Sequence, residues 1–164
     1  MSKGRFTRSR GFSLLELVIV VVIIGIIAAI AIPRMSRGTA GAADSALTGD
    51  LAVLRNAIDL FAAEHDGKFP TATGFTAQLT QYTDDSSTST PVATKDKDHP
   101  FGPYLRAVPK LPVGANKGKD GISTTGSPGS DATAGWFYEP AAGKIVANCA
   151  ATEVDSVEKK YSDY

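Results

Sequence analysis

The sequence has little of the chemistry on which small enzymes rely. Its single cysteine, Cys149, excludes an intramolecular disulfide and is interpreted as a small, partly buried residue, with an intermolecular bridge or a reactive thiol as alternatives. Its two histidines, His65 and His99, are interpreted as solvated side chains rather than ligands. No nucleophile elbow, zinc-binding helix motif or phosphate-binding glycine loop is present. We therefore expect a protein that is not an enzyme.

The chain also lacks an excess of charge of either sign. It has 17 basic and 17 acidic residues, but residues 1–11 contain four basic residues and no acidic one. The remainder is therefore mildly acidic, and no basic surface large enough to bind nucleic acid is predicted.

One long segment lacks polar side chains. Residues 17–32 contain no charged or hydrogen-bonding side chain, and together with Phe12–Leu15 they form about 31 Å of helix, enough to cross a bilayer. The basic residues precede this segment, so the N-terminus is expected in the cytoplasm and the rest of the chain outside. Glu16 interrupts the segment, although a carboxylate at the centre of a membrane helix costs about 2.5–3.5 kcal/mol.

Two common kinds of segment leave Glu16 unexplained. A secretory signal peptide would have a basic start, an apolar stretch and the small residues of Ala29-Ile30-Ala31 at its cleavage site. A plain membrane anchor would have the same apolar length.

A third interpretation explains the glutamate. The order Gly11, Phe12, Glu16 and then an apolar helix resembles the class III signal of type IV pilins and type II secretion pseudopilins. The resemblance implies that a prepilin peptidase removes the leader, residues 1–11, by cutting between Gly11 and Phe12. It also implies N-methylation of Phe12, with the helix retained in the mature protein.

The same resemblance assigns assembly roles within the transmembrane or filament-core helix, residues 12–33. Glu16 would meet the cationic N-terminal amine of a neighbouring subunit. Gly25 and Ala29, small residues four apart, would let neighbouring helices approach closely. Pro33 would ordinarily end or kink a helix, but in this family the helix commonly continues beyond it.

Residues 34–66 are predicted to continue this helix as an amphipathic half. Apolar residues recur with helical spacing on one face, and Gly67 followed by Pro70 marks the end, so the whole helix is expected over Phe12–Asp66. The residues of that face are Leu47, Leu51, Leu54, Ile58 and Phe61.

The segment that follows indicates which of the pilin-like proteins the chain resembles most. Ile58–Leu79, with Gly67, Phe69-Pro70, Thr71 and Gly74, is similar to the region after the long helix in major pseudopilins, and Tyr104–Pro112 is similar to their entry into the sheet.

The remaining sequence predicts an α+β, pilin-like fold, in which the long helix packs on a small antiparallel sheet. The globular region is residues 67–150, with loops at 83–98 and 114–135, because both stretches have almost nothing to bury. Residues 136–138 and 144–146 predict a β-hairpin. Residues 151–164 are expected to form a charged tail, mobile or folded as a short surface helix.

Calcium is the only metal considered, because some major pseudopilins hold it with loop carboxylates. Asp120 and Asp131, or Asp84, Asp85, Asp96 and Asp98, are the candidates, but none shows a ligand spacing. We therefore expect no cofactor.

The resemblance implies a structural subunit of a type II secretion pseudopilus, which helps to export folded proteins. The alternative is a subunit of a type IV or competence pilus, used in adhesion, motility or DNA uptake; a secreted domain behind a cleaved signal peptide is a third possibility. Expected partners are further copies of the chain, the prepilin peptidase, the inner-membrane assembly platform and minor pilin-like subunits. The expected location is the bacterial cytoplasmic membrane.

Overall fold

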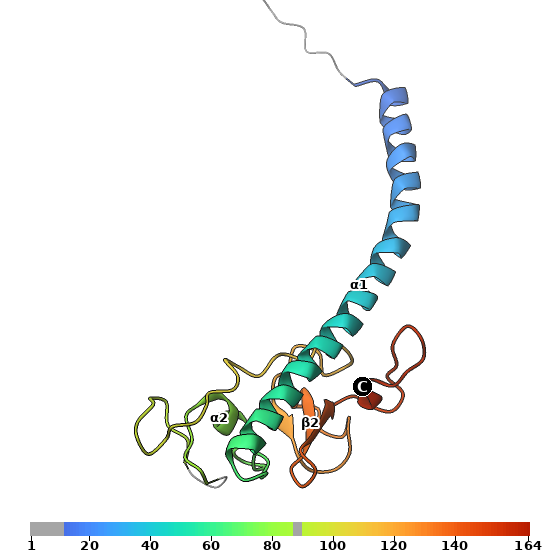
Figure 1. Ribbon diagram of the computed structural model, residues 1–164. Helices are drawn as coiled ribbons and strands as arrows, with labels where there is room; N and C mark the ends of the chain where they lie inside the picture. The colour runs from blue at the N-terminus through green and yellow to red at the C-terminus, as the bar shows by residue number, and fades with distance from the viewer. Residues whose placement is uncertain (1–11, 87–89) are drawn as a thin grey trace, which may run out of the picture. The chain divides into compact units, whose positions relative to one another are not determined.

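The computed structural model describes residues 12–86 and 90–164, without the side chains of residues 32–40. It contains α1 (Leu14–Glu64), α2 (Phe75–Thr80), β1 (Ile122–Ser123), β2 (Trp136–Glu139), β3 (Lys144–Ala147) and the short 3₁₀ helix η1 (Tyr161–Asp163) (Figure 1). The chain forms two compact units, residues 1–39 and residues 40–164, which are described separately.

Helix α1 agrees with the predicted helix to within two residues at each end. Its backbone stays helical through Pro33. At its C-terminal end Asp66 and Gly67 adopt left-handed φ angles of 54° and 74°. The N–H of Gly67 donates to the carbonyl of Ala62 at 2.8 Å, the 6→1 bond of a Schellman motif. The prediction that Gly67 ends the helix is confirmed.

The second unit is built around one face of α1. The five apolar residues predicted for that face are at most 1% exposed, and they share a core with Trp136, Tyr138 and Ile145 of the sheet and with Phe75 and Leu79 of α2. Burying a large apolar side chain contributes roughly 1.5–3 kcal/mol, so this face anchors the helix to the rest of the unit. Together with the long apolar helix, this confirms the predicted α+β, pilin-like fold.

The sheet has three strands in the order β1-β2-β3. β2 and β3 form the predicted antiparallel hairpin, with Trp136 opposite Ala147 and Glu139 opposite Lys144. β1 pairs parallel with β2, so the sheet is mixed and the prediction of an antiparallel sheet is wrong in this respect. β1 was missed because it is two residues long and lies inside the glycine-rich stretch 114–135.

Hydrogen bonds, rather than apolar burial, order that glycine-rich stretch. The Asn148 side chain is fully buried and donates to the carbonyls of Asp131 at 2.7 Å and Ala134 at 2.8 Å. Its own oxygen accepts the N–H of Gly129 at 2.6 Å. Asn116 donates to the carbonyl of Asn148 at 2.8 Å. Buried amides with all their partners in place are rigid, so this predicted loop is a folded part of the unit.

His65 departs from its prediction. The side chain is fully buried and stacks on Phe61, with ring centroids 3.8 Å apart. Its Nδ1 lies 2.7 Å from the carbonyl oxygen of Phe61, one turn earlier in the helix. The imidazole therefore caps a carbonyl group in the last turn of α1. His99 is partly exposed and contacts Asp96 at 2.8 Å.

Cys149 is fully buried, whereas partial burial was predicted. Burial, followed by the nearby charge of Glu153, raises the pKa of its thiol to about 12. The thiol therefore stays protonated at neutral pH, where it packs as a small apolar group.

The C-terminal residues fold against the unit rather than forming a mobile tail. The Asp155 carboxylate accepts the N–H groups of Val157 at 2.8 Å and Lys159 at 2.9 Å, and the Tyr164 hydroxyl donates to it. The Lys159 ammonium lies 3.8 Å from the centre of the Tyr164 ring.

Two further contacts fasten this segment to α1. The Arg55 guanidinium donates to the backbone oxygen of Tyr164 and, at 3.3 Å, to the carbonyl of Ile145 in β3. The Tyr161 hydroxyl donates to Asp44 at 3.1 Å. The C-terminal segment thereby joins helix and sheet.

The stability that the Asp155 contacts give to the C-terminal segment depends on pH. The Tyr164 hydroxyl and the N–H groups of Lys159 and Val157 hold the pKa of Asp155 below its ordinary value. A depressed pKa stabilises the fold above the ordinary value of about 3.9, and that contribution is lost as pH falls through the pKa of the folded state. We expect Asp155→Asn to lower the melting temperature at pH 7, and the difference from wild type to vanish at low pH.

The measurement is thermal unfolding of the full chain in detergent between about pH 7 and pH 2. Asp163→Asn, which alters an exposed carboxylate of the same segment, should change little at any pH. A wild-type advantage over Asp155→Asn that persists unchanged into acid would contradict the assignment.

Candidate processing and assembly segment

The first unit begins with a capping box at the N-terminus of α1. The Ser13 hydroxyl oxygen accepts the N–H of Leu15 at 3.3 Å, and the Glu16 carboxylate accepts the N–H of Ser13 at 3.1 Å. These two bonds satisfy two of the four N–H groups that a helix start leaves without partners.

The capping box gives Glu16 a role within its own chain. A carboxylate in the first helical turn also interacts favourably with the helix dipole. The cost of this charge is therefore partly offset before any neighbour arrives. The sequence contains a signal for this role that was not used above, because Ser13-x-x-Glu16 before an apolar run is the spacing of a capping box.

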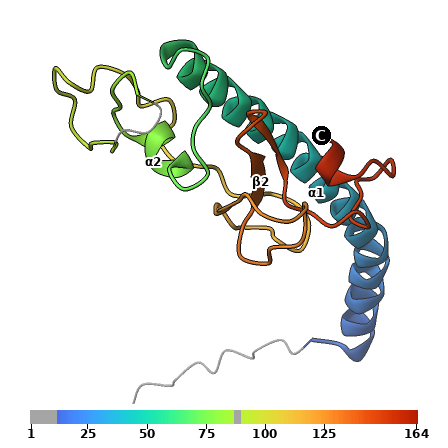
Figure 2. The ribbon, with the colours of Figure 1, turned by 90° about the horizontal axis from the view of Figure 1, so that it is seen from below.

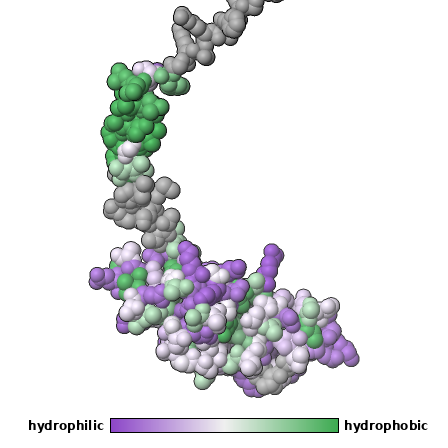
Figure 3. Space-filling view, turned by 180° about the vertical axis from the view of Figure 1, so that it is seen from behind, coloured by the Kyte–Doolittle hydropathy of each residue, from purple (hydrophilic) through white to green (hydrophobic). Residues whose placement is uncertain are grey.

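The helix that follows exposes apolar side chains along its length. Leu14–Ala31 is long and apolar enough to cross a membrane, and none of this span is buried within the chain. Figure 3 shows the span as a continuous hydrophobic column. A surface of this kind needs lipid or other helices around it.

The small residues predicted to serve assembly lie on this exposed surface. Gly25 and Ala29 are both exposed, and no atom lies within 4 Å of the position that a Cβ on Gly25 would occupy. Nothing in the described part of the chain fills this space, so another helix could approach its backbone there.

Among the other residues predicted for assembly and processing, Pro33 belongs to α1, where the structure describes its backbone but not its side chain. Phe12 precedes the capping box and is exposed. Gly11 and the rest of the leader, residues 1–11, lie outside the described residues.

The calcium candidates do not form a metal site in the described part of the chain, although Asp84, Asp85 and Asp98 line one open pocket together with Lys97. Asp131 accepts the N–H and hydroxyl of Thr133 at 2.8 and 2.7 Å, which hold the pKa of Asp131 below its ordinary value. Asp120 is exposed at the edge of an open pocket. Among the side chains that the structure describes, no three His, Cys, Asp or Glu residues could hold one metal ion.

The ammonium group of Lys119 lies between two oxygen atoms of the glycine-rich stretch 114–135. Lys119 Nζ donates to Asn116 Oδ1 at 2.8 Å and to the carbonyl of Ala132. Asn116 in turn contacts the carbonyls of Asp131 and Asn148. Lys119 thus links the start of this stretch to its end.

Comparison with known protein families identifies the N-terminal segment. Residues 6–32 match the prokaryotic N-terminal methylation motif. This motif is typical of type IV pilin-like proteins, which have an apolar N-terminal helix, and the predicted resemblance is confirmed. The match spans Gly11, Phe12 and Glu16 and continues through the apolar helix.

The motif implies processing by a prepilin peptidase and assembly of the pilus type, in a class of structural subunits that are generally not enzymes. It does not distinguish a secretion pseudopilin from a pilus subunit. No curated protein and no solved structure matches the chain.

Proposed function

We propose that the chain is a structural subunit of a type II secretion pseudopilus. The observation that supports a filament subunit is the methylation motif, placed directly on an exposed apolar helix that starts with a glutamate capping box. The prepilin peptidase cuts between Gly11 and Phe12 and methylates the new amine. The subunit then leaves the bacterial cytoplasmic membrane for a helical filament whose core is made of these helices.

The segment after α1 supports a pseudopilin. The Gln78 side chain accepts the N–H of Thr71 at 2.8 Å, and the Thr71 hydroxyl accepts the N–H of Gly74 at 3.1 Å. A Cβ on Gly74 would lie 2.6 Å from that hydroxyl, so a larger residue there would have to displace Thr71 or Gln78 and disturb these hydrogen bonds. Thr71 and Gly74, which this segment shares with major pseudopilins, therefore help to position α2.

The alternative is a type IV or competence pilus subunit. Pilins of that kind commonly fasten a C-terminal loop with two cysteines, and Cys149 alone cannot do so. In this chain, Asp155, Tyr164 and Arg55 fasten the C-terminal segment by hydrogen bonds. This replacement favours the pseudopilin.

In the proposed location the basic residues before the helix stay in the cytoplasm and the second unit lies outside the membrane. The partners are further copies of the chain, the prepilin peptidase, the inner-membrane assembly platform and minor pilin-like subunits.

The proposal predicts the mature N-terminus. Protein purified from membranes of its native host should begin at Phe12 and carry a methyl group on its amine, as read by N-terminal sequencing and intact mass. A strain without prepilin peptidase should retain residues 1–11. A mature protein that begins near Ile32 would instead show a cleaved secretory signal and would overturn the proposal.

Two substitutions separate the charge of Glu16 from its capping role. Glu16→Gln keeps an acceptor for the N–H of Ser13, whereas Glu16→Ala removes it. If Glu16 also pairs with the amine of a neighbour, both variants should insert normally and lose filaments by about a hundredfold or more, because breaking a buried ion pair costs roughly 3–5 kcal/mol.

The measurement is the amount of filament relative to membrane-inserted protein. Filaments from Glu16→Gln at the wild-type level, with Glu16→Ala defective, would leave capping as the only role of this residue.

We also propose that the ammonium group of Lys119, and not a bound metal ion, holds the glycine-rich stretch 114–135 in its folded conformation. Lys119→Met would leave Asn116 Oδ1 and the Ala132 carbonyl without this donor, at a cost of about 1–3 kcal/mol. We expect a lower melting temperature for this variant, and no shift for wild type with either a chelator or millimolar calcium. Lys117→Met, at an exposed neighbouring position, is the control. A wild-type melting temperature that falls on chelation would refute the proposal.

A further inference from the structure

The C-terminal segment presents an exposed apolar side chain on a turn, residues 154–160, which we call the Val157 turn. Val157 is 77% exposed, and Val154 on the same turn is 41% exposed. The backbone of Val154 pairs with that of Lys160, and the Asp155 carboxylate accepts the N–H of Val157 at 2.8 Å. An apolar group that is held in one conformation loses little entropy when a partner covers it.

The backbone of the Val157 turn is strained at Glu158. This residue has a φ angle of 65°, in the left-handed region that favours glycine. Its N–H donates to the carbonyl of Asp155 at 3.3 Å. Such a conformation persists only where the surrounding contacts fix it, so the turn displays Val157 in a defined position.

A second turn with exposed apolar residues connects β2 and β3. Ala141 and Ala142 are exposed at its tip. A ring carbon of Phe69 lies 2.5 Å from the position that a Cβ on Gly143 would occupy, so the aromatic ring packs directly against the backbone of this turn. We call residues 139–144 the Ala141 turn.

The two turns lie at opposite ends of the second unit. Directly after the Val157 turn, the Tyr161 hydroxyl donates to Asp44, near the first residues of the unit. Phe69, which contacts the Ala141 turn, instead follows the C-terminal end of α1 at Glu64. The helix from Asp44 to Glu64 is about 30 Å long at 1.5 Å per residue. In Figure 1 the C-terminal segment lies beside the upper part of the unit and the C-terminal end of α1 at its lower edge, and Figure 2 shows the same separation along α1.

Both turns carry charged side chains that have no partner in the described part of the chain. On the Val157 turn, Glu158 and Lys160 are exposed, and their side chains make no hydrogen bond or ion pair with any other residue that the structure describes. The same holds for Glu139 and Lys144, which lie opposite each other at the start of the Ala141 turn. Lys159 adds a second ammonium group to the Val157 turn, so a carboxylate is the complementary group on a partner.

We propose that the Val157 turn of one copy docks on the Ala141 turn of another copy, which is shifted along the filament. Val157 packs against Ala141 and Ala142, and Lys160 pairs with Glu139. This proposal rests on the proposed function, and it adds an end-to-end contact between the second units of two copies.

The membrane origin of the filament selects unlike ends of two copies. Every copy inserts with its basic N-terminal residues on the same side of the membrane, so all copies are parallel. In parallel copies the Val157 turn of one molecule can face the Ala141 turn of another, whereas two Val157 turns point in the same direction. Two different surfaces that meet in this way form a heterologous contact, which propagates into a helical filament when it does not close into a ring.

Paired cysteines test the contact in the full chain, expressed in its native host with its assembly machinery. Val157→Cys combined with Ala141→Cys should give a ladder of disulfide-linked multimers on mild oxidation, whereas either substitution alone should give neither a dimer nor a ladder. Cys149 is fully buried and should not compete.

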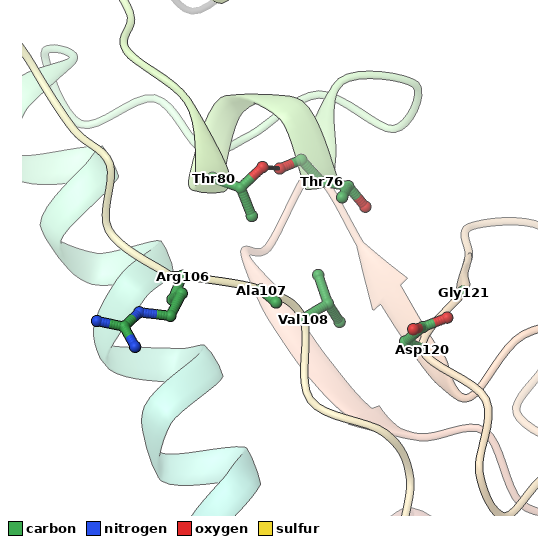
Figure 4. Close-up of a pocket in the computed structure, with 7 residues that line it drawn as sticks. All are labelled: Thr76, Thr80, Arg106, Ala107, Val108, Asp120 and Gly121. Carbon is green, nitrogen blue, oxygen red and sulfur yellow. Dashed lines mark hydrogen bonds between the residues drawn. The ribbon is translucent and has the colours of Figure 1, made fainter. Parts of the chain in front are cut away.

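The matched control combines Val157→Cys with Ala107→Cys. Ala107 is an exposed alanine, as Ala141 is, but it lies in an open pocket that residues of α2 and of the segment 106–108 line (Figure 4). This pocket belongs to neither turn, so the control pair should give no ladder.

Charge reversal tests the pairing independently. Lys160→Glu alone should lower the filament yield by about fivefold or more through repulsion from Glu139, and Glu139→Lys alone should do the same by repelling Lys160. The double variant should recover most of the yield. Recovery would also show that neither single substitution acts by unfolding the protein.

The outcomes separate this proposal from the proposed function. If wild type forms no multimers, the filament function fails and this contact fails with it. If wild type forms filaments but the pair at Val157 and Ala141 gives no ladder, or the double reversal gives no recovery, the filament function stands and the docking proposal is overturned. A dimer from Val157→Cys alone would show that like ends meet, and a ladder from the control pair would show unspecific collision; either result would also overturn it.

Discussion

The structure depends on an apolar helix surface that has no partner in its own unit. None of the side chains from Leu14 to Ala31 is buried, and apolar area left in water costs about 25 cal/mol per Å². Such a segment is stable only in lipid or among other helices, so it can move from membrane to filament while remaining apolar in its surroundings. The capping box of Ser13 and Glu16 fits this requirement, because it completes the helix start from within the chain.

The second unit, residues 40–164, is held together in a different way, since its sheet is too small to do so alone. The three strands are two, four and four residues long, and much of the chain between them is rich in glycine, serine and threonine. Apolar burial is concentrated on one face of α1, while Asn148, Lys119 and Asp155 organise the segments that bury little. Polar groups with several partners each fix loop geometry that an apolar contact would leave loose.

The sequence predicted the parts of this architecture that repeat or that obey strong local rules. The apolar run, the helical spacing from Leu47 to Phe61, the Gly67 stop and the β2–β3 hairpin are patterns of this kind. It did not predict β1, the docked C-terminal segment or the burial of His65, because each depends on partners far away in the chain, such as Trp136 for β1 and Arg55 for Tyr164. At the candidate site, the resemblance to the pilin signal predicted roles for Gly11, Phe12 and Glu16, whereas the bond from Ser13 to Glu16 became visible only once the helix start was placed.

The two apolar faces of α1 in the second unit have opposite requirements. The buried face must hold the unit together whether or not the subunit is assembled, so its residues are large and completely enclosed. The opposite face of the same helix segment is exposed and combines alanine and glycine with only two large apolar side chains, Val53 and Leu60. This composition limits the apolar area that a single copy leaves in water, whereas the buried face is free to be as apolar as the core requires.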